Sequence, residues 1–326
     1  MGELWVIGEP SPDGGLSRLS TEVATLARGL AAASHREAVG IMVAAEPTAA
    51  AVELARYLPL VLSVTDPAAG DHAWSALAAG RVAGLLAAAP APPDAILVGA
   101  GPDGRDLAGA LSALTGLGVV TNATAVTWGE TGPAVEMSAF GGKLLTTSGF
   151  TDGRGIVTVR PNVVTAEPAA SAGSVEAREA PGSELPAVRI VERVREAGGA
   201  APIEEARIIV AGGRGVGGPE GFTLVEELAE ALGGAVGATR AAVDSGWIGY
   251  SQQIGQTGKI VKPELYLALG VSGAIQHKVG MQTAGSIVAI NRDPDAPIAE
   301  FADLVVVGDL FEVGAALLEQ LRARHG

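Results

Sequence analysis

The sequence contains no cysteine and few aromatic residues. Its 326 residues include 0 cysteines and 4% aromatics, although 48% are hydrophobic. Without a thiol, disulfides, thiolate chemistry and cysteine-held iron–sulfur clusters are excluded, and a zinc site is disfavoured. With so few aromatic rings, the core must be built mainly from Ala, Val, Leu and Ile, with the 46 glycines in tight turns between elements.

Basic residues are also scarce. Lys and Arg total 22 against 36 Asp and Glu, which gives a formal net charge of −14. The excess of acidic residues extends over both halves of the chain, so neither half presents a basic face. Nucleic acid and anionic membrane surfaces are therefore poor partners.

Neither a leader peptide nor a membrane span is expected. The first ten residues, MGELWVIGEP, have no basic region before an apolar one and are typical of a strand. Residues 107–129 form an uncharged run long enough to cross a bilayer, but glycines, threonines and an asparagine divide it into a helix and strands. The sequence therefore predicts a cytoplasmic protein that is not membrane-embedded.

Short β-branched runs alternate with Ala- and Leu-rich helical stretches in the first half of the chain. Such runs at 4–9, 38–44, 60–65 and 95–101 are each followed by a helical stretch. This order is typical of βαβ units in a parallel sheet. Residues 118–162 then contain four strand-like runs with no helix between them, which predicts an antiparallel extension of the sheet.

A stretch rich in Pro, Ala, Ser and Glu at 165–187 predicts a connection between two domains. We expect an N-terminal α/β domain at 1–187 and a C-terminal domain at 188–326, in which 188–198 forms a strand that crosses toward the second domain. The predicted fold class is α/β, with a mostly parallel, doubly wound sheet in each domain. In such sheets ligands bind beyond the carboxyl ends of the strands. The loops at those ends in the second domain are therefore the candidates for a site.

A glycine-rich turn follows the first strand-like run of the second domain. Gly213, Gly215 and Gly218 have the G-x-G-x-x-G spacing of a dinucleotide-binding turn. The next strand leads to Arg240, where an NAD enzyme has an acidic residue on the ribose. An NADP-binding oxidoreductase or transhydrogenase-like domain therefore stays open, as does a plain strand–helix turn. Arg214 places a cation among bare backbone amides, which suits a phosphate or a carboxylate.

Further loops of the second domain carry neutral polar side chains. Residues 244–259 contain glutamines, glycines and a threonine that suit a planar heterocycle, with a solvated surface loop as the alternative. A later short helix begins with Gln276 and His277, although His277 taken alone is more typical of a structural histidine. Asn291 ends a strand, and Asp309 is typical of a helix N-cap. No nucleophile–base arrangement or metal-ligand spacing is evident, so we expect neither a catalytic residue nor a metal ligand.

The residues of these loops resemble the alpha subunits of electron-transfer flavoproteins. The series GQTGK, PELY, SGAIQH and INRDP carries the resemblance within residues 206–326, and the first half is similar more loosely, including a GG turn at 141–142. The resemblance implies an FAD-containing electron carrier, with a C-terminal FAD-binding Rossmann-like domain and no substrate turnover of its own. It implies a heterodimer with a beta subunit. Electrons would come from flavin dehydrogenases, such as acyl-CoA dehydrogenases of fatty acid beta-oxidation, and pass to a membrane quinone oxidoreductase.

The resemblance also implies a set of residues that line the cofactor. These are Arg214, Thr239, Arg240, Ile254, Gly255, Gln256, Thr257, Ser272, Gly273, Ala274, Ile275, Gln276, His277, Asn291, Asp309 and Leu310. The hydroxyl of Thr257 is expected near flavin N5, His277 near the N1/C2=O edge, and the last three residues on the adenosine side. Arg240 is expected against the flavin ring, with a surface ion pair to Asp244 as the alternative. The SAFGGK stretch at 138–143 departs from the family pattern, so the first domain is assigned only packing against the partner.

Overall fold

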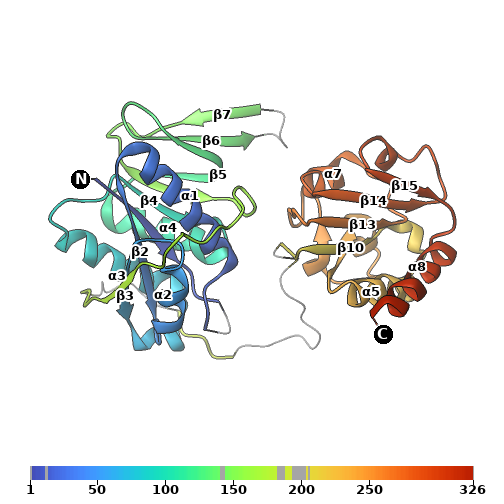
Figure 1. Ribbon diagram of the computed structural model, residues 1–326, viewed down its shortest axis with the longest axis horizontal. Helices are drawn as coiled ribbons and strands as arrows, with labels where there is room; N and C mark the ends of the chain where they lie inside the picture. The colour runs from blue at the N-terminus through green and yellow to red at the C-terminus, as the bar shows by residue number, and fades with distance from the viewer. Residues whose placement is uncertain are drawn as a thin grey trace. The chain divides into compact units, whose positions relative to one another are not determined.

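The computed structural model of the chain shows a mixed α/β fold in two compact units, Met1–Val194 and Arg195–Gly326. The residues that it describes are 2–11, 14–139, 144–181, 188–192, 203–204 and 206–325. Two mostly parallel sheets, one in each unit, confirm the predicted fold class (Figure 1). No helix in the described part of the chain is long and apolar enough to cross a membrane.

The first unit is built on a nine-stranded sheet. Its strands are β1 (Glu3–Gly8), β2 (Glu37–Ala44), β3 (Leu60–Thr65), β4 (Ala95–Gly99), β5 (Val119–Trp128), β6 (Pro133–Ala139), β7 (Leu144–Ser148), β8 (Gly155–Val159) and β9 (Ser174–Ala177). They lie in the order β7-β6-β5-β8-β4-β1-β2-β3-β9. The central strands are parallel and buried on both faces, which is why their sequences are continuous apolar runs.

The antiparallel extension predicted for 118–162 is right for β5, β6 and β7 and wrong for β8. β8 lies parallel between β4 and β5, and all five of its residues are buried. Its sequence, GIVTV, is an apolar run interrupted by one threonine, which suits an interior position better than a half-exposed hairpin. The GG turn at 141–142 lies outside the described residues.

The segment after β8 adds another strand to the same sheet. Within 165–187, β9 pairs parallel with β3 at the far edge. The strand expected at 188–198 is wrong over its described part, 188–192. There the backbone of Val188 and Ile190 bonds to the loop at 71–73, at 2.7 and 2.8 Å, and only an isolated bridge forms. These backbone bonds are made within the first unit, so the chain here does not begin a strand of the second.

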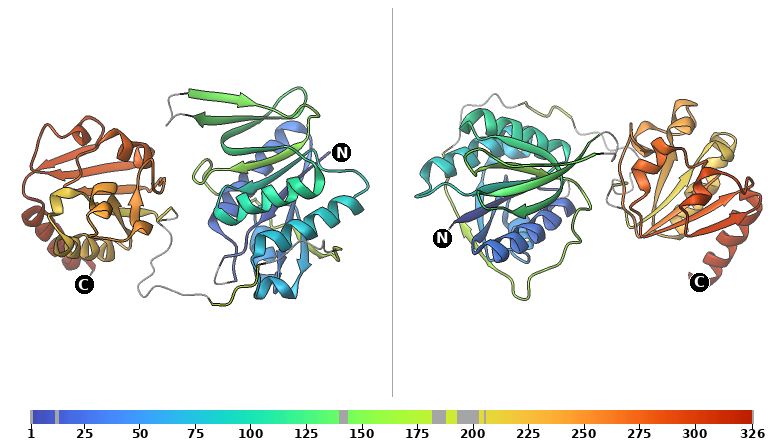
Figure 2. Two further views of the ribbon diagram at one scale, coloured as in Figure 1. Left: turned by 180° about the vertical axis from the view of Figure 1, so that it is seen from behind. Right: turned by 90° about the horizontal axis from the view of Figure 1, so that it is seen from above.

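Two pairs of helices cover the first sheet (Figure 2). They are α1 (Arg18–Ser34) and α2 (Thr48–Leu54) on one face, and α3 (Trp74–Ala88) and α4 (Pro102–Thr115) on the other. Helix α1 begins at the N-cap Ser17, whose hydroxyl accepts from the Ser20 N–H, and ends at His35 in the left-handed conformation. The apolar stripe of α1, which includes Val23, Ala27 and Leu30, packs on the sheet as an amphipathic helix does.

The second unit is a six-stranded, all-parallel sheet. Its strands are β10 (Ile208–Gly212), β11 (Ala235–Thr239), β12 (Gln253–Ile254), β13 (Leu265–Leu269), β14 (Ser286–Asn291) and β15 (Leu304–Val307). The order β12-β11-β10-β13-β14-β15 is that of a doubly wound dinucleotide-binding sheet. The direction of winding reverses between β10 and β13, so a ligand crevice is expected at the carboxyl ends of these two strands.

The helices of the second unit are unequally divided between the two faces of the sheet. They are α5 (Phe222–Ala231), α6 (Arg240–Asp244), α7 (Ile275–Met281) and α8 (Leu310–His325). α5 and α8 pack together over one face through residues such as Leu228 and Leu318. The other face is covered by α7, which contributes Met281, and by loop residues such as Val261 and Ile298. Both cores are mainly aliphatic, as the composition predicts.

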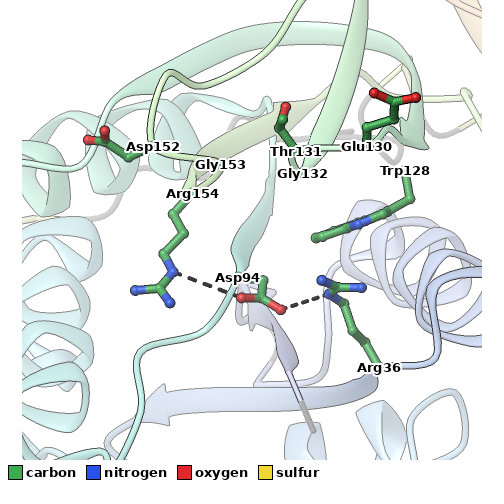
Figure 3. A pocket seen from close by; sticks show the side chains of 9 residues that line it. All are labelled: Arg36, Asp94, Trp128, Glu130, Thr131, Gly132, Asp152, Gly153 and Arg154. Atoms are coloured by element: carbon green, nitrogen blue, oxygen red, sulfur yellow. Dashed lines mark hydrogen bonds and ion pairs between the residues drawn. The ribbon is translucent and has the colours of Figure 1, made fainter.

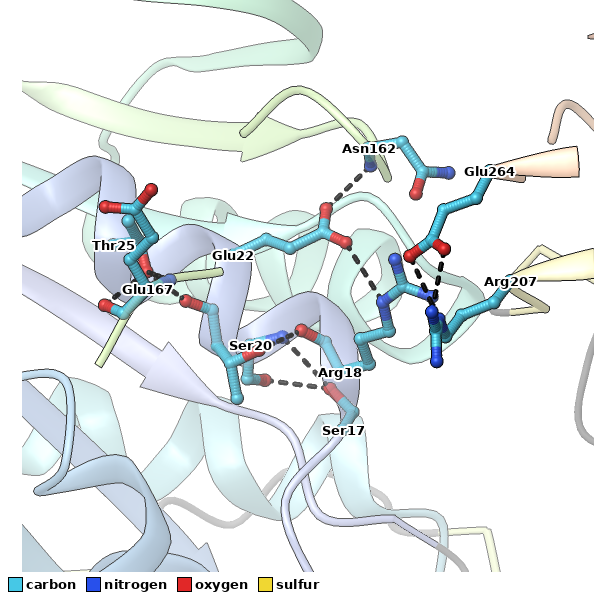
Figure 4. A network of polar contacts seen from close by, with 10 residues as sticks. Ser17, Arg18, Ser20, Glu22, Thr25, Asn162, Glu167, Arg207 and Glu264 are labelled. Atoms are coloured by element: carbon cyan, nitrogen blue, oxygen red, sulfur yellow. Dashed lines mark hydrogen bonds and ion pairs between the residues drawn. The ribbon is translucent and has the colours of Figure 1, made fainter. Parts of the chain in front are cut away.

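A buried carboxylate in the first unit fastens α1 to the loop after β8 (Figure 4). Glu22 is 4% exposed, and its Oε2 accepts from the Asn162 N–H at 2.6 Å. The Arg18 Nε lies 3.5 Å from its other oxygen. Asn162 has a φ of 63°, in the left-handed region that few residues other than glycine adopt. The Glu22 carboxylate therefore holds this left-handed turn against the helix.

Replacing Glu22 with Ala should destabilise the first unit by about 1–3 kcal/mol, because the half-buried N–H of Asn162 loses its acceptor. Glu22→Gln keeps an acceptor and should recover part of the loss. Glu46→Ala, at an exposed position, is the control and should stay within about 0.5 kcal/mol of the parent. The measurement is urea unfolding followed by tryptophan fluorescence, since three of the four tryptophans lie in this unit. Equal midpoints for Glu22→Ala and Glu46→Ala would contradict the role given to this carboxylate.

Candidate functional site

The glycine-rich turn after β10 touches the loop after β13, where the strand order reverses. The N–H groups of Gly213 and Gly215 donate to the carbonyls of Leu269 and Gly270 at 2.9 and 3.0 Å. A Cβ on Gly213 would lie 2.3 Å from the Gly270 oxygen, and one on Gly215 would lie 2.6 Å from the Gly270 Cα. Both positions therefore require glycine, because the two backbones are in direct contact. Arg214 lies between them and is exposed.

A small cavity opens at the same edge of the sheet. Its lining residues come from the ends of four strands and are Gly215, Gly270, Asn291, Arg292, Gly308, Asp309, Leu310 and Phe311. The three residues expected on the adenosine side, Asn291, Asp309 and Leu310, are thus brought together. Sequence reasoning missed Gly270, Arg292, Gly308 and Phe311. The last three could have been found by their position, since each is next to a predicted residue in the sequence.

Two of these cavity residues also have local roles in the fold. The Asn291 amide nitrogen donates to the Val271 carbonyl at 3.0 Å, which joins the ends of β14 and β13. The Asp309 Oδ1 accepts from the N–H groups of Phe311 and Glu312 at 2.8 and 3.4 Å. These bonds confirm the predicted N-cap at the start of α8.

Thr239, the last residue of β11, has a hydroxyl without a partner. The residue is 9% exposed. Among the described residues, its Oγ1 is the one buried side-chain oxygen or nitrogen that has no hydrogen-bond partner. A buried hydroxyl left unpaired costs about 1–3 kcal/mol, so such groups in folded proteins call for an explanation. Thr239 lies at the carboxyl end of a strand, which is where ligands bind in doubly wound sheets.

Arg240 begins α6 directly after this threonine. Its Nε lies 3.1 Å from the Asp244 Oδ2, four residues on, and both side chains are more than half exposed. The surface pair weighed as the alternative is therefore present. Such i,i+4 pairs contribute only about 0.3–0.5 kcal/mol, so this one does little to hold the guanidinium in place. Its predicted contact with a flavin ring is compatible with this exposure.

The neutral loop after β12 is fastened against α7. The N–H of Gln256 donates to the Gln276 carbonyl at 2.7 Å. Gly255, with a φ of 137°, is buried, and a Cβ on Gly280 would lie 2.4 Å from its nitrogen. These glycines let the loop press directly on the helix. The buried Ile254 anchors its start, and the side chains of Gln256 and Thr257 remain exposed.

The turn between β13 and α7 presents small residues. Ser272 and Ala274 are exposed, whereas Gly273 is buried with a φ of 79°. A Cβ on Gly273 would lie 2.4 Å from the nitrogen of Ile298, so the turn requires glycine. The first residues of α7, Ile275 and Gln276, are also exposed.

His277 is the buried member of this group. It is 6% exposed, and its Nδ1 lies 3.0 Å from the Ile254 carbonyl oxygen, so Nδ1 carries the proton and donates. The Tyr266 hydroxyl, 2.8 Å from Nε2, donates to the second nitrogen. Burial lowers the pKa of His277 to about 4, against the opposing effect of the Ile254 bond, and burial raises the pKa of Tyr266. Both ring nitrogens thus have partners inside the fold, as expected of a structural histidine, and the placement of His277 near the flavin N1/C2=O edge stays a prediction. Tyr266 was missed from the sequence.

A larger cavity, of about 240 Å³, lies in the first unit (Figure 3). The Arg36 guanidinium lies 3.9 Å from the centre of the Trp128 ring, and its Nε is 2.7 Å from the Asp94 Oδ2. The Arg154 Nε is 3.9 Å from the other Asp94 oxygen. The Asp94 carboxylate thus pairs with both cations, and Glu130 and Asp152 add further negative charge to the lining. The cluster ties turns to the sheet and is poorly suited to an anion.

Known proteins match both units of the chain. Residues 4–185 match the family model described as "Electron transfer flavoprotein domain", and residues 202–282 match "Electron transfer flavoprotein FAD-binding domain". The "Electron transfer flavoprotein subunit alpha" of Mycobacterium tuberculosis (strain ATCC 25618 / H37Rv) is 42% identical over 327 residues, which cover 100% of both chains. The protein of that name from Bacillus subtilis (strain 168) is 36% identical over 323 residues, 97% of this chain and 96% of its own. This chain belongs to the electron transfer flavoprotein alpha-subunit family.

FAD is therefore the cofactor of the second unit, and the match to the FAD-binding domain decides against the NADP alternative. Features of the structure fit it. The backbone contact at Gly213, Gly215 and Gly270 leaves an approach without side chains, and the cavity beside it is lined from strand ends. The Thr239 hydroxyl is buried and unpaired at the same edge.

Stability of the second unit should fall as the pH is lowered from about 6.5 to about 4. In this window unfolded His277 takes up a proton, while the buried ring stays neutral, so the unfolded state is favoured by up to roughly 3 kcal/mol at the acid end. Above pH 6.5 the ring is neutral in both states, and the stability that the buried neutral His277 provides is fully present. His277→Gln should lack this part of the pH dependence. NMR titration of the imidazole in the full chain measures the pKa directly, and a midpoint near 6.5 would contradict the burial argument.

Proposed function

We propose that this chain is the FAD-holding subunit of a heterodimeric electron carrier that a beta subunit completes. The carrier receives electrons from flavin dehydrogenases, such as acyl-CoA dehydrogenases, and passes them to a membrane quinone oxidoreductase. It has no substrate turnover of its own. The observation that carries the proposal is the carboxyl edge of the second sheet, where exposed backbone and neutral side chains converge in a chain of this family.

The residues proposed to hold FAD lie along this edge. On the adenosine side, Asn291, Asp309 and Leu310 line the cavity at the ends of β14 and β15. On the flavin side are Arg240 at the start of α6, Thr257 in the loop after β12, and the exposed residues Ser272, Ala274, Ile275 and Gln276 in the turn before α7 and its first residues. FAD, when bound, supplies the redox chemistry. The protein's own residues bind it, orient it and set the charge around it.

Exposed apolar side chains beside these loops support a partner subunit. Tyr250 and Ile275 are 64% and 73% exposed. The Tyr250 hydroxyl donates to the Thr257 carbonyl, and Ile275 precedes Gln276, whose carbonyl accepts from the Gln256 N–H. Large apolar side chains grouped near a polar site are typical of an interaction surface. A beta subunit seated there would cover them and shield the flavin from solvent.

The chain co-purified with its beta subunit should be yellow, and acid should release FAD that is identified by chromatography. The chain expressed alone should lose FAD or aggregate, because the loops around the cofactor stay uncovered. Co-expression with the beta subunit should restore FAD. A colourless complex whose bound nucleotide is NADP would overturn the proposal, and a stable FAD-replete monomer would overturn the need for a partner.

Arg240→Ala should make the first one-electron reduction of bound FAD harder. Two unit charges about 4 Å apart interact by roughly 4 kcal/mol at an effective dielectric near 20. Solvent screens part of this, since the side chain is exposed, and a tenfold change in a one-electron equilibrium is about 59 mV. The midpoint potential should therefore fall by something on the order of 100 mV. A stepwise reductive titration followed by absorbance measures it.

Two variants control this titration. Arg240→Lys should recover part of the potential, because the charge survives without the planar guanidinium. Arg207→Ala removes the same charge at the amino end of β10, opposite to the carboxyl ends where FAD is proposed to bind. It should leave the potential near that of the parent. If Arg240→Ala titrates like Arg207→Ala, Arg240 is not at the flavin.

A further inference from the structure

A buried glutamine lies directly behind the exposed Thr257. Gln253 is the first residue of β12 and is 3% exposed. Its side-chain nitrogen donates to the Thr257 Oγ1 at 3.1 Å. Its backbone is fixed as well, because its carbonyl accepts from the Lys259 N–H at 2.7 Å and Gly258 packs against the same oxygen. The glutamine amide is therefore a fixed donor at the base of the loop.

This contact determines the direction of the Thr257 hydroxyl proton. A threonine hydroxyl has one proton and two lone pairs. Since one lone pair accepts from Gln253, the proton points away from the buried amide, toward the exposed side of the loop. The Thr257 carbonyl accepts from the Tyr250 hydroxyl at 2.8 Å, and the neighbouring Gln256 N–H is bonded to α7. The backbone is held in this way, and the bond from Gln253 restricts the rotation of the Thr257 O–H about its Cβ–Oγ1 bond.

We propose that Gln253 is a positioning residue that presents the Thr257 hydroxyl as a hydrogen-bond donor to bound FAD. The inference rests on the proposed function, in which this hydroxyl lies near flavin N5, an acceptor in the oxidised ring. A neutral amide suits the task because a carboxylate at this position would only accept, and would turn the hydroxyl proton inward. A donor oriented by the fold needs no reorganisation when the ring changes charge.

The test uses the complex with the beta subunit, loaded with FAD that is ¹⁵N-labelled at N5. The readouts are the N5 chemical shift and the midpoint potential of the first reduction. Thr257→Val should move the N5 resonance toward its position without a hydrogen bond. It should also lower the equilibrium constant of the first one-electron reduction about fivefold. Gln253→Met, which keeps the volume but loses the donor, should move both readouts in the same direction by up to this amount. Thr257→Ser should behave as the parent.

Two further variants separate orientation from packing. Gln253→Met combined with Thr257→Val should change nothing beyond Thr257→Val alone, because the glutamine acts through the hydroxyl. Gln252→Met is the matched control, since the side chain of this neighbouring glutamine accepts from the Ser251 hydroxyl at 2.9 Å. It should leave both readouts at the parent values. If the Gln253→Met complex does not assemble, Gln253→Glu at pH 8 replaces it, and the N5 resonance should again lose its donor.

The possible outcomes distinguish this inference from the function on which it rests. If Thr257→Val moves N5 and Gln253→Met does not, the inference fails and the proposed function stands. A Gln253→Met shift in the opposite direction means that the amide oxygen faces Thr257, and it also overturns the inference. An effect that persists without the Thr257 hydroxyl shows packing and overturns it too. If neither variant moves N5, Thr257 is not beside the ring, and a complex that takes up no FAD refutes the proposed function itself.

Discussion

The backbone contact between the turn after β10 and the loop after β13 is the constraint on which the second unit depends. Gly213 and Gly215 lie so close to Gly270 that a single Cβ on either would meet main-chain atoms. This contact closes the point where the winding of the sheet reverses, and it removes side chains from the place where a ligand approaches. The cavity residues of β14 and β15, and the exposed loops after β11 and β12, are arranged around it. The glycines of the motif therefore serve packing first, and cofactor access follows from that packing.

Much of the fold could be predicted from the sequence because its signals are local. Apolar runs bounded by turns located the parallel strands, and the Asp309 N-cap located the start of α8. The errors concern pairing, which is not local. β8 follows three antiparallel strands in the chain and still lies parallel between β4 and β5, because both of its faces are buried there. Residues 188–192 have a strand-like composition, but their backbone partners lie at 71–73, more than a hundred residues earlier.

The candidate site could be predicted residue by residue only where the loop motif itself carries the signal. Arg240 and Thr257 fall in that class, and both are exposed at the expected edge. Gln253 and Tyr266 were missed because their side chains are buried and act through a neighbour, Thr257 in one case and His277 in the other. A pattern of residue types does not show which buried amide donates to which hydroxyl. Which groups meet depends on the register of β12 against β11 and on the backbone bond that holds the loop against α7.

The polar groups at this edge divide by whether the fold already satisfies them, and the division suits an electron carrier. His277 uses both ring nitrogens internally, and its lowered pKa, about 4, keeps it neutral near pH 7. The Thr239 hydroxyl is unpaired, and the Thr257 proton is directed outward by Gln253. A histidine titrating beside the cofactor would couple each electron to a proton. Hydroxyl donors and an arginine do not change charge near neutral pH. Under the proposed function, the edge offers bound FAD side chains whose charges do not change near neutral pH.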